Sequence, residues 1–261
     1  MPEFIRVEQA SGVGRVTLAR AERHNCFNEV MMGEITAAFR DLGGDRKVRV
    51  VVLASDGDSF SAGADVNWMR RMVDYSFDEN VSDAMVLARM LRTIHDCPKP
   101  VIARVQGAAL GGGVGLTAAC DMAVAAERAF FALTEVKLGI IPAVISPFVL
   151  EKIGMGAMRR YALTAERFDA EEAKRIGLIS DVERTDAEMD AWIADRVKAL
   201  SGNSPEALAA CKAVLREVSE YDWDKAATIT AKRIAERRVS ADGQEGLRAF
   251  LEKRPPAWTK G

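Results

Sequence analysis

The sequence predicts an α/β protein whose C-terminal region is entirely helical. In the first two-thirds of the chain, short apolar or alternating segments typical of strands are separated by segments with helical periodicity. After about residue 185 the strand segments stop, and four amphipathic helical segments follow as far as Leu251. We therefore predict a core over residues 1–185 and a helical region over residues 186–261.

Composition and charge are those of a globular protein and do not indicate binding to nucleic acid or to a membrane. The chain is 49% hydrophobic and 28% charged, and its 36 basic and 38 acidic residues give a net charge of −2. This balance favours neither nucleic acid nor anionic membranes as a partner. No apolar run approaches the roughly 18–20 residues that span a bilayer, and the N-terminus lacks the pattern of a signal peptide. The four cysteines have no CxxC spacing, so we expect a cytoplasmic protein without a metal site.

The N-terminal elements are predicted from local patterns. Residues 4–8 and 13–18 alternate around Ser11-Gly12, which indicates an antiparallel hairpin. Asn28 can cap the amphipathic helix that follows. Its predicted inward positions are Met31, Met32, Ile35, Ala38 and Phe39.

The following segments repeat a strand-to-helix order. Residues 48–54 are β-branched and almost all apolar, which is typical of a strand covered on both faces. A long helix is predicted over residues 80–96, because two prolines follow it. Strands are then expected over residues 101–105 and 122–125, with a glycine run and a short helix between them.

Small residues follow the predicted strand at residues 48–54. Phe60-Ser-Ala-Gly-Ala-Asp65 would let the backbone approach a ligand and turn its N–H groups toward it. Taken alone, this pattern is also that of an ordinary strand-to-helix turn.

Three successive glycines, Gly111 to Gly113, open the short helix. A helix start has unpaired N–H groups and the positive end of the helix dipole, so it suits an oxyanion. The glycines also satisfy a dinucleotide pattern, with Glu135 lying 20 residues after Gly115. A nicotinamide enzyme therefore stays an alternative, although the short helix and the acid beyond the next strand fit it poorly.

Glu135 stands within an otherwise apolar segment, Phe131-Ala-Leu-Thr-Glu-Val-Lys-Leu-Gly-Ile-Ile-Pro142. It is either a solvated turn residue or a pocket acid whose pKa is raised by burial. A raised pKa would suit proton transfer near neutral pH.

In their order and spacing, these three segments resemble the crotonase (enoyl-CoA hydratase/isomerase) superfamily. Lys99-Pro100 and residues 245–255 extend the resemblance over essentially the whole chain. It implies a crotonase-like spiral of ββα units with a helical C-terminal region for trimerisation and CoA contact, assembled as a homotrimer or homohexamer. It also implies an enzyme that acts on a coenzyme A thioester through an enolate, without a cofactor.

The resemblance assigns roles to particular residues. The backbone N–H groups of Ala64 and Gly112 would form an oxyanion hole, and Glu135 would be the acid–base residue. The residues that it places along the bound substrate are Ala62, Gly63, Asp65, Gly111, Arg23, Phe250 and Lys253. The last two would contact CoA from the same subunit or from a neighbouring one.

The chain also departs from the family pattern. Hydratases of this family usually carry a Glu where this chain has Gly115, and often a Lys where it has Asn67. The usual glycine-rich stretch after the second acid is replaced by residues 143–147. With residues 160–169, these features resemble the bacterial 3-methylglutaconyl-CoA hydratases of leucine degradation.

A glutaconyl substrate would offer a reason for Gly115. Such a substrate carries its own carboxylate, which a second enzyme carboxylate would repel, and glycine would leave space for a branched β-carbon. Arg70 or Arg71 would be candidates to pair with the distal carboxylate, although each also fits a solvated helix face. The alternatives are a double-bond isomerase on the same scaffold and a non-catalytic acyl-CoA binder.

Overall fold

A six-stranded sheet forms the centre of the computed structural model, which describes residues 2–219 and 221–259. Its order is β1-β2-β3-β5-β7-β10. Only β1 and β2 pair antiparallel, and the other neighbours are parallel. The strands are β1 Ile5–Ala10, β2 Val13–Leu18, β3 Val50–Ser55, β5 Val101–Val105, β7 Met122–Ala126 and β10 Asp181–Glu183. The predicted hairpin is confirmed, and its turn residues Ser11 and Gly12 both have positive φ, as tight hairpins require.

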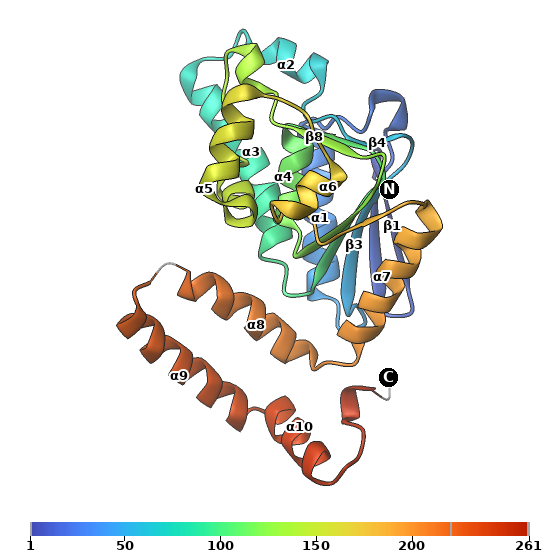
Figure 1. Ribbon diagram of the computed structural model, residues 1–261, viewed down its shortest axis with the longest axis vertical. Helices are drawn as coiled ribbons and strands as arrows, with labels where there is room; N and C mark the ends of the chain where they lie inside the picture. Colours follow the sequence, from blue (N-terminus) through green and yellow to red (C-terminus); the bar gives the residue numbers. More distant parts are fainter. Residues whose placement is uncertain (1, 220, 260–261) are drawn as a thin grey trace.

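A smaller sheet of four short strands lies beside the first, in the order β4-β6-β8-β9. Its strands are β4 Ser59–Ser61, β6 Ala108–Leu110, β8 Phe130–Ala132 and β9 Phe168–Asp169. Each of β3, β5 and β7 in the large sheet is followed by β4, β6 or β8 in the small sheet, and then by a helix (Figure 1). The predicted spiral of ββα units is therefore confirmed.

Helices cover both faces of the large sheet. The core helices are α1 Glu29–Gly44, α2 Val66–Met72, α3 Phe77–His95, α4 Gly112–Ala119, α5 Ser146–Thr164 and α6 Ala170–Arg175. On one face, Val51 and Leu53 of β3 join the main core with α1 and α3. On the other face, Val50 and Val52 pack with Trp192 of α7 (Asp186–Ser201). The expectation that this strand is buried on both faces is confirmed.

Local capping explains where the helices begin. Asn28 Oδ1 accepts a hydrogen bond from the N–H of Met31 at 3.0 Å, as the sequence predicts. The α3 helix begins three residues before the predicted Asn80, because Ser76 and Glu79 form a capping box. All five predicted inward residues of α1 are buried.

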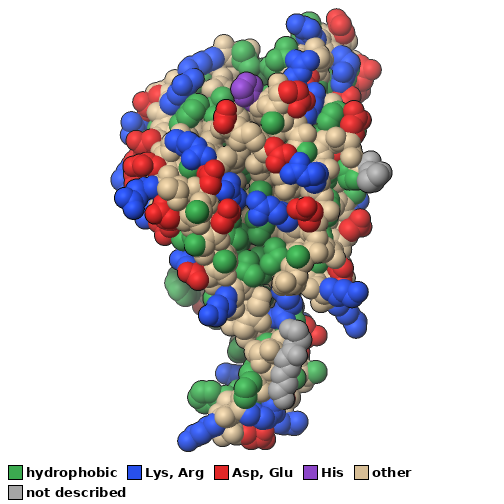
Figure 2. Space-filling model, turned by 90° about the vertical axis from the view of Figure 1, so that its right-hand side faces the viewer, with side chains coloured by type: hydrophobic (Ala, Val, Ile, Leu, Met, Phe, Trp, Pro, Cys, Tyr) green, Lys and Arg blue, Asp and Glu red, His purple; other side chains and the backbone are tan. Residues whose placement is uncertain are grey.

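The last three helices form an arm that projects from the core. They are α8 Pro205–Val218, α9 Trp223–Val239 and α10 Ala241–Leu251, and they complete the four predicted helical segments. In Figure 1, α10 lies at the opposite end of the molecule from α2. Figure 2 shows the arm as a narrow projection below a broad core with mixed charges on its visible face. Arg49 holds the base of the arm through the carbonyls of Ser201, Asn203 and Trp258.

The helical C-terminal region therefore has two parts, one packed on the core and one projecting from it. Its first helix, α7, belongs to the packing of the large sheet, whereas α8 to α10 leave the core. Among the residues that the structure describes, no helix is both long and apolar enough to cross a membrane.

Candidate active site

Two loops meet at the ends of β4 and β6. A Cβ on Gly63, whose φ is +87°, would lie 2.9 Å from the carbonyl oxygen of Leu110. A Cβ on Gly113 would lie 2.2 Å from the carbonyl oxygen of Ser61. Only glycine at these positions lets the two backbones approach so closely.

The approach brings together two backbone N–H groups that the sequence singles out. The N–H of Phe27 donates to Gly63 and the N–H of Asp65 donates to Phe27, at 2.9 and 3.0 Å, so Ala64 lies between two paired residues. Gly112 is the first residue of α4, where N–H groups lack helical partners. Within residues 2–219 and 221–259, neither the Ala64 nor the Gly112 N–H has a hydrogen-bond partner. Both residues line one cavity of about 490 Å³.

Glu135 lines the same cavity from the start of a short 3₁₀ helix, η2 (Glu135–Leu138), directly after β8. A Cβ on Gly111 would lie only 3.0 Å from Oε1 of Glu135. The glycine at position 111 therefore leaves room for the Glu135 carboxyl. The Oε2 atom is buried and has no hydrogen-bond partner in the described part of the chain. Burial raises the pKa of this carboxyl, and a hydrogen bond from its own backbone N–H only partly opposes the effect. Glu135 is thus a pocket acid rather than a solvated turn residue.

The rest of the cavity is mainly apolar. Among the described residues, Asn80, Asp83 and Glu135 are the only lining side chains with an amide or a carboxyl group, and no Lys or Arg lines the cavity. Its apolar lining consists of Phe27, Ala64, Trp68, Met69, Met72, Ala84, Leu87, Ile140, Ile141, Pro142, Ala143, Val144 and Ile145. The cavity therefore suits an acyl chain beside a polarised carbonyl group.

The two arginines considered for a distal carboxylate are engaged elsewhere. Arg71 pairs with Glu29 at 2.5 Å, and Arg70 donates to the side chain of Asn67 at 3.1 Å. Both are exposed on α2 and neither lines the cavity. Their pairing with a substrate carboxylate is therefore not supported.

Gly115 does not open space for the substrate, and this expectation is wrong. A Cβ at position 115 would lie 2.4 Å from Cγ2 of Ile145. Ile145 is buried and itself lines the cavity, so it fills the volume that the glycine vacates.

Asp65 is occupied by its own chain. It caps α2 by accepting hydrogen bonds from the N–H groups of Asn67 and Trp68, and it pairs with Arg20 at 2.7 Å. Burial alone would raise the pKa of Asp65, but these hydrogen bonds and Arg20 together lower it. The carboxylate thus organises the loop, and its contact with CoA stays a prediction.

The remaining predicted residues fall in two places. The N–H of Ala62 donates to the carbonyl of His24 at 2.9 Å, which brings the exposed Arg23 beside the Gly63 loop. Phe250 and Lys253 lie in or just after α10, and Phe250 is 81% exposed. The structure does not bring these last two residues to the cavity of the same chain (Figure 1).

The sequence reasoning singled out Ala64, Gly112 and Glu135 among the lining residues and missed others, of which Trp68, Asp83 and Ile145 matter most for the site. Asp83 had a usable signal, because it stands among inward positions of α3 that include Leu87, Leu91 and Ile94. An acid on an apolar helical stripe is unusual, because Asp is rarely buried without a partner, and it therefore indicates a pocket or a buried hydrogen bond. Ile145 had no local signal, since its partner Gly115 is 30 residues earlier in the chain.

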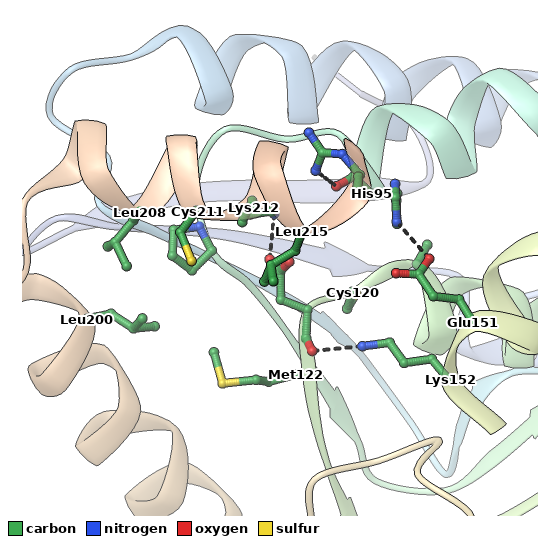
Figure 3. Close-up of a pocket in the computed structure, with 14 residues that line it drawn as sticks. His95, Cys120, Met122, Glu151, Lys152, Leu200, Leu208, Cys211, Lys212 and Leu215 are labelled. Atoms are coloured by element: carbon green, nitrogen blue, oxygen red, sulfur yellow. Dashed lines mark hydrogen bonds and ion pairs between the residues drawn. The ribbon is translucent and has the colours of Figure 1, made fainter. Parts of the chain in front are cut away.

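A second cavity, of about 330 Å³, lies between α8 and the core. Lys212 donates to the carboxylate of Asp121 and Lys152 donates to its carbonyl oxygen. Figure 3 shows both lysines with their bonds as dashed lines. Glu135 does not line this cavity. The Lys212 bond attaches α8 to the core, and the first cavity is therefore the candidate active site.

Comparison with known proteins agrees with this geometry. The profile of the enoyl-CoA hydratase/isomerase family matches residues 8–261. A Thermus thermophilus protein named provisionally as an enoyl-CoA hydratase is 33% identical over 97% of this chain and 99% of its own. The peroxisomal Δ(3,5)-Δ(2,4)-dienoyl-CoA isomerase of Arabidopsis thaliana is also 33% identical, over 99% of this chain and 96% of its own.

The fold itself is matched by solved structures. The crystal structure of an enoyl-CoA hydratase from Shewanella pealeana has a TM-score of 0.95 and 42% identity, covering 98% of this chain and 96% of that one. The match extends over the core and the arm together, and a dinucleotide-binding unit is therefore not the correct interpretation of the glycine run. The chain belongs to the enoyl-CoA hydratase/isomerase family of the crotonase superfamily.

Proposed function

We propose that the protein hydrates an enoyl-CoA thioester, with Glu135 as the residue that transfers protons. One observation carries the proposal: within the described part of the chain, Glu135 has a buried, unpartnered Oε2 in the same apolar cavity as the unpaired N–H groups of Ala64 and Gly112. Preorganised N–H donors stabilise negative charge as it develops on a carbonyl oxygen. A carboxyl with a raised pKa can both accept and return a proton near neutral pH.

The proposed hydration has two steps. The Glu135 carboxylate takes a proton from water while the water oxygen bonds to Cβ of the enoyl group. The electron pair of the double bond moves to the thioester oxygen, and the N–H groups of Ala64 and Gly112 hold the resulting enolate. The enolate then takes a proton at Cα from the Glu135 carboxyl, which restores the carbonyl and the carboxylate.

A double-bond isomerase is the second candidate, and the packing at Gly115 favours it. Ile145 excludes a second acid at this position, whereas one carboxyl is enough to remove a proton at one carbon and return it at another. A relative named as a dienoyl-CoA isomerase is 33% identical to this chain. Both reactions pass through an enolate, and both use the Glu135 carboxyl and the N–H groups of Ala64 and Gly112.

The charges that line the cavity also indicate which acyl groups it can accept. The sequence resemblance points to 3-methylglutaconyl-CoA, whose distal carboxylate would need a cation. Asp83 and Glu135 line the cavity instead, without a Lys or Arg among the described residues. We therefore favour an uncharged linear or branched enoyl-CoA over a glutaconyl substrate.

The test is turnover of a panel of CoA thioesters by wild-type protein and Glu135→Gln. Crotonyl-CoA, a branched methyl homologue, 3-methylglutaconyl-CoA and a 3-enoyl-CoA would be compared, with the hydrated and isomerised products separated by chromatography. The variant should bind a saturated acyl-CoA as wild type does, while kcat falls by roughly 10² or more. Undiminished turnover by Glu135→Gln would remove this residue from the mechanism, and preference for 3-methylglutaconyl-CoA would overturn the substrate assignment.

We also propose that the protein assembles as a homotrimer or homohexamer. The arm exposes large apolar side chains that its own chain does not cover: Leu215, Trp223, Val239, Phe250 and Leu251. Burial of such side chains stabilises subunit contacts. Sedimentation velocity would measure the assembly directly.

A further inference from the structure

Asp83 places a carboxyl within the apolar wall of the cavity. It lines the cavity on α3 together with Ala84 and Leu87, on the face that packs toward the core. The indole Nε1–H of Trp68 donates to Asp83 Oδ1 at 2.9 Å. Trp68 is only 3% exposed, so this bond fixes the carboxyl against a rigid, buried ring.

Aromatic side chains separate Asp83 from the oxyanion hole. The rings of Trp68 and Phe27 are 6.4 Å apart, and Cζ of Phe27 lies 2.2 Å from the position of a Cβ on Gly112. The contacts thus run from Gly112 through Phe27 and Trp68 to Asp83. A carboxyl three contacts removed from Gly112 is expected to meet the far end of an acyl group rather than its reacting carbons.

Asp83 forms no ion pair within the described residues. The nearby Arg71 pairs with Glu29, and the charges of these two residues act on the pKa of Asp83 in opposite directions. Its second oxygen, Oδ2, has no hydrogen-bond partner in the part of the chain that the structure describes. Burial raises the pKa of Asp83, while the hydrogen bond from Trp68 lowers it. An ionised carboxylate offers only acceptor oxygens, so Oδ2 is a free acceptor.

We propose that Asp83, positioned by Trp68, determines specificity by excluding acyl groups with an anionic end and by accepting a hydrogen bond from a hydroxyl at that end. The inference rests on the proposed function, because it assumes that the cavity takes the acyl chain of a CoA thioester. A second carboxylate beside Asp83 would be repelled in a partly desolvated site. A terminal hydroxyl would donate a hydrogen bond to Oδ2. A terminal methyl group forms no hydrogen bonds, so it would neither gain nor lose one beside Asp83.

The test uses saturated acyl-CoA ligands, so that binding is measured without turnover. Butyryl-, hexanoyl- and octanoyl-CoA would each be compared with their ω-hydroxy and ω-carboxy forms by isothermal titration calorimetry. The variant is Asp83→Asn, whose amide oxygen can still accept from Trp68. The matched control is Asp78→Asn, which makes the same charge change at an exposed position of α3 outside the cavity.

At the chain length that reaches Asp83, wild type should bind the ω-carboxy ligand on the order of 10-fold more weakly than the methyl ligand. Asp83→Asn should remove most of this difference while leaving the Kd of the methyl ligand within about 2-fold. The variant should also bind the ω-hydroxy ligand more weakly relative to the methyl ligand than wild type does, because a neutral amide replaces the charged acceptor Oδ2. Asp78→Asn should behave as wild type does.

The inference is overturned if Asp83→Asn keeps the wild-type ratio between methyl and ω-carboxy ligands at all three lengths. It is also overturned if wild type binds the two ligands equally. Failure of the proposed function has a different signature: wild type would bind these ligands with the expected ratios, yet would not turn over the unsaturated thioesters. Circular dichroism of each variant excludes misfolding as a source of weak binding.

Discussion

Ile145 occupies the space that a side chain at position 115 would need. Its Cγ2 lies 2.4 Å from the position of a Cβ on Gly115, and Leu91 Cδ1 lies 3.6 Å from the same point. Ile145 is 2% exposed and immediately precedes α5, whose packing against α4 limits its movement. The family resemblance places an acid at position 115 in hydratases. In this chain a glycine–isoleucine pair replaces that acid, and packing accounts for the glycine without reference to the substrate.

This packing predicts strong coupling between the two positions. Gly115→Ala should lower the free energy of unfolding by about 1–3 kcal/mol, because the new methyl group overlaps Ile145. Ile145→Ala should cost about 2–5 kcal/mol through the lost side chain. The double variant should be more stable than the sum of the single effects predicts, by about 1 kcal/mol or more, since the alanine methyl at position 115 then has room. Urea unfolding of wild type, the two single variants and the double variant measures the four free energies of unfolding that this comparison requires.

Gly33→Ala is the matched control for this cycle. Gly33 lies in the exposed face of α1, and a Cβ there would meet nothing within 4 Å. The same substitution should therefore stabilise the protein by about 0.5–1 kcal/mol at position 33. The proposed overlap is contradicted if the effects of Gly115→Ala and Ile145→Ala on the free energy of unfolding add up in the double variant to within about 0.5 kcal/mol.

The buried carboxyl of Glu135 predicts a dependence of stability on pH. Because burial raises the pKa of Glu135 in the folded protein, the folded state binds this proton more tightly than the unfolded chain does. The resulting stabilisation is complete below the unfolded pKa and is lost as pH rises through the folded pKa. Glu135→Gln is neutral throughout, so the stability of wild type relative to this variant should fall as pH rises above about 4, the pKa of Glu in the unfolded chain, through the raised pKa of the folded state.

Chemical denaturation at several pH values checks this trend. Glu127→Gln alters an exposed carboxyl outside the cavity and should leave the pH profile of stability as in wild type. A stability difference between wild type and Glu135→Gln that does not change with pH would show that Glu135 is as well solvated in the folded protein as in the unfolded chain.

The oxyanion donors are backbone groups, so their test must remove an N–H without adding atoms. Substituting Gly112 is unsuitable, because a Cβ there would lie 2.2 Å from Cζ of Phe27. Replacing Ala64 by lactic acid changes its amide to an ester and keeps the methyl group. We expect kcat to fall by on the order of 10²–10³, the usual cost of one lost oxyanion donor.

The corresponding ester at Val66 is the control for Ala64. Val66 is the first residue of α2 and is 62% exposed, and its N–H is not one of the two that Asp65 accepts. Its ester should leave kcat within about 3-fold of wild type, in keeping with a group outside the transition state. Equal kcat values for the two esters would rule out the Ala64 N–H as an oxyanion donor.

Local chemistry made much of the fold predictable from the sequence. The hairpin turn at Ser11-Gly12 and the cap at Asn28 each satisfy a requirement of neighbouring residues, and both occur where predicted. The start of α3 was also readable, because Ser76 and Glu79 have the spacing of a capping box, although the predicted helix began at residue 80. The strands of the small sheet are only two or three residues long, too short for an alternating pattern to appear.

The candidate site was predictable in part, for a similar reason. The loops around Gly63 and Gly112 and the acid Glu135 stand out as motifs, and the structure brings them to one cavity. The Trp68–Asp83 hydrogen bond and the Gly115–Ile145 contact join residues 15 and 30 positions apart. Such pairs depend on how α2, α3 and α5 pack, which no local pattern specifies.

Phe250 and Lys253 allow the proposed assembly and the active site to be tested together. Both lie on the arm, away from the cavity of their own chain, so a contact with CoA would have to come from a neighbouring subunit. The double variant Phe250→Ala/Lys253→Ala should raise KM for an acyl-CoA while kcat stays near wild type, because such a contact binds ground state and transition state alike. Glu135→Gln should have the opposite signature, a low kcat with binding preserved.

Mixed oligomers of the two variants distinguish a neighbour's contact from a contact within one chain. After the subunits are dissociated and reassembled together, some sites combine Glu135 of one subunit with Phe250 and Lys253 of the next. These sites should show the wild-type KM, so activity at low substrate concentration should exceed the sum of the two separate variants. A mixture of the arm variant with Glu127→Gln subunits, whose active-site residues and arm are unchanged, gives the reference for complete exchange. If the mixture with Glu135→Gln shows only the summed activities while the reference exchanges, Phe250 and Lys253 do not serve a neighbouring active site, and the arm contributes to assembly alone.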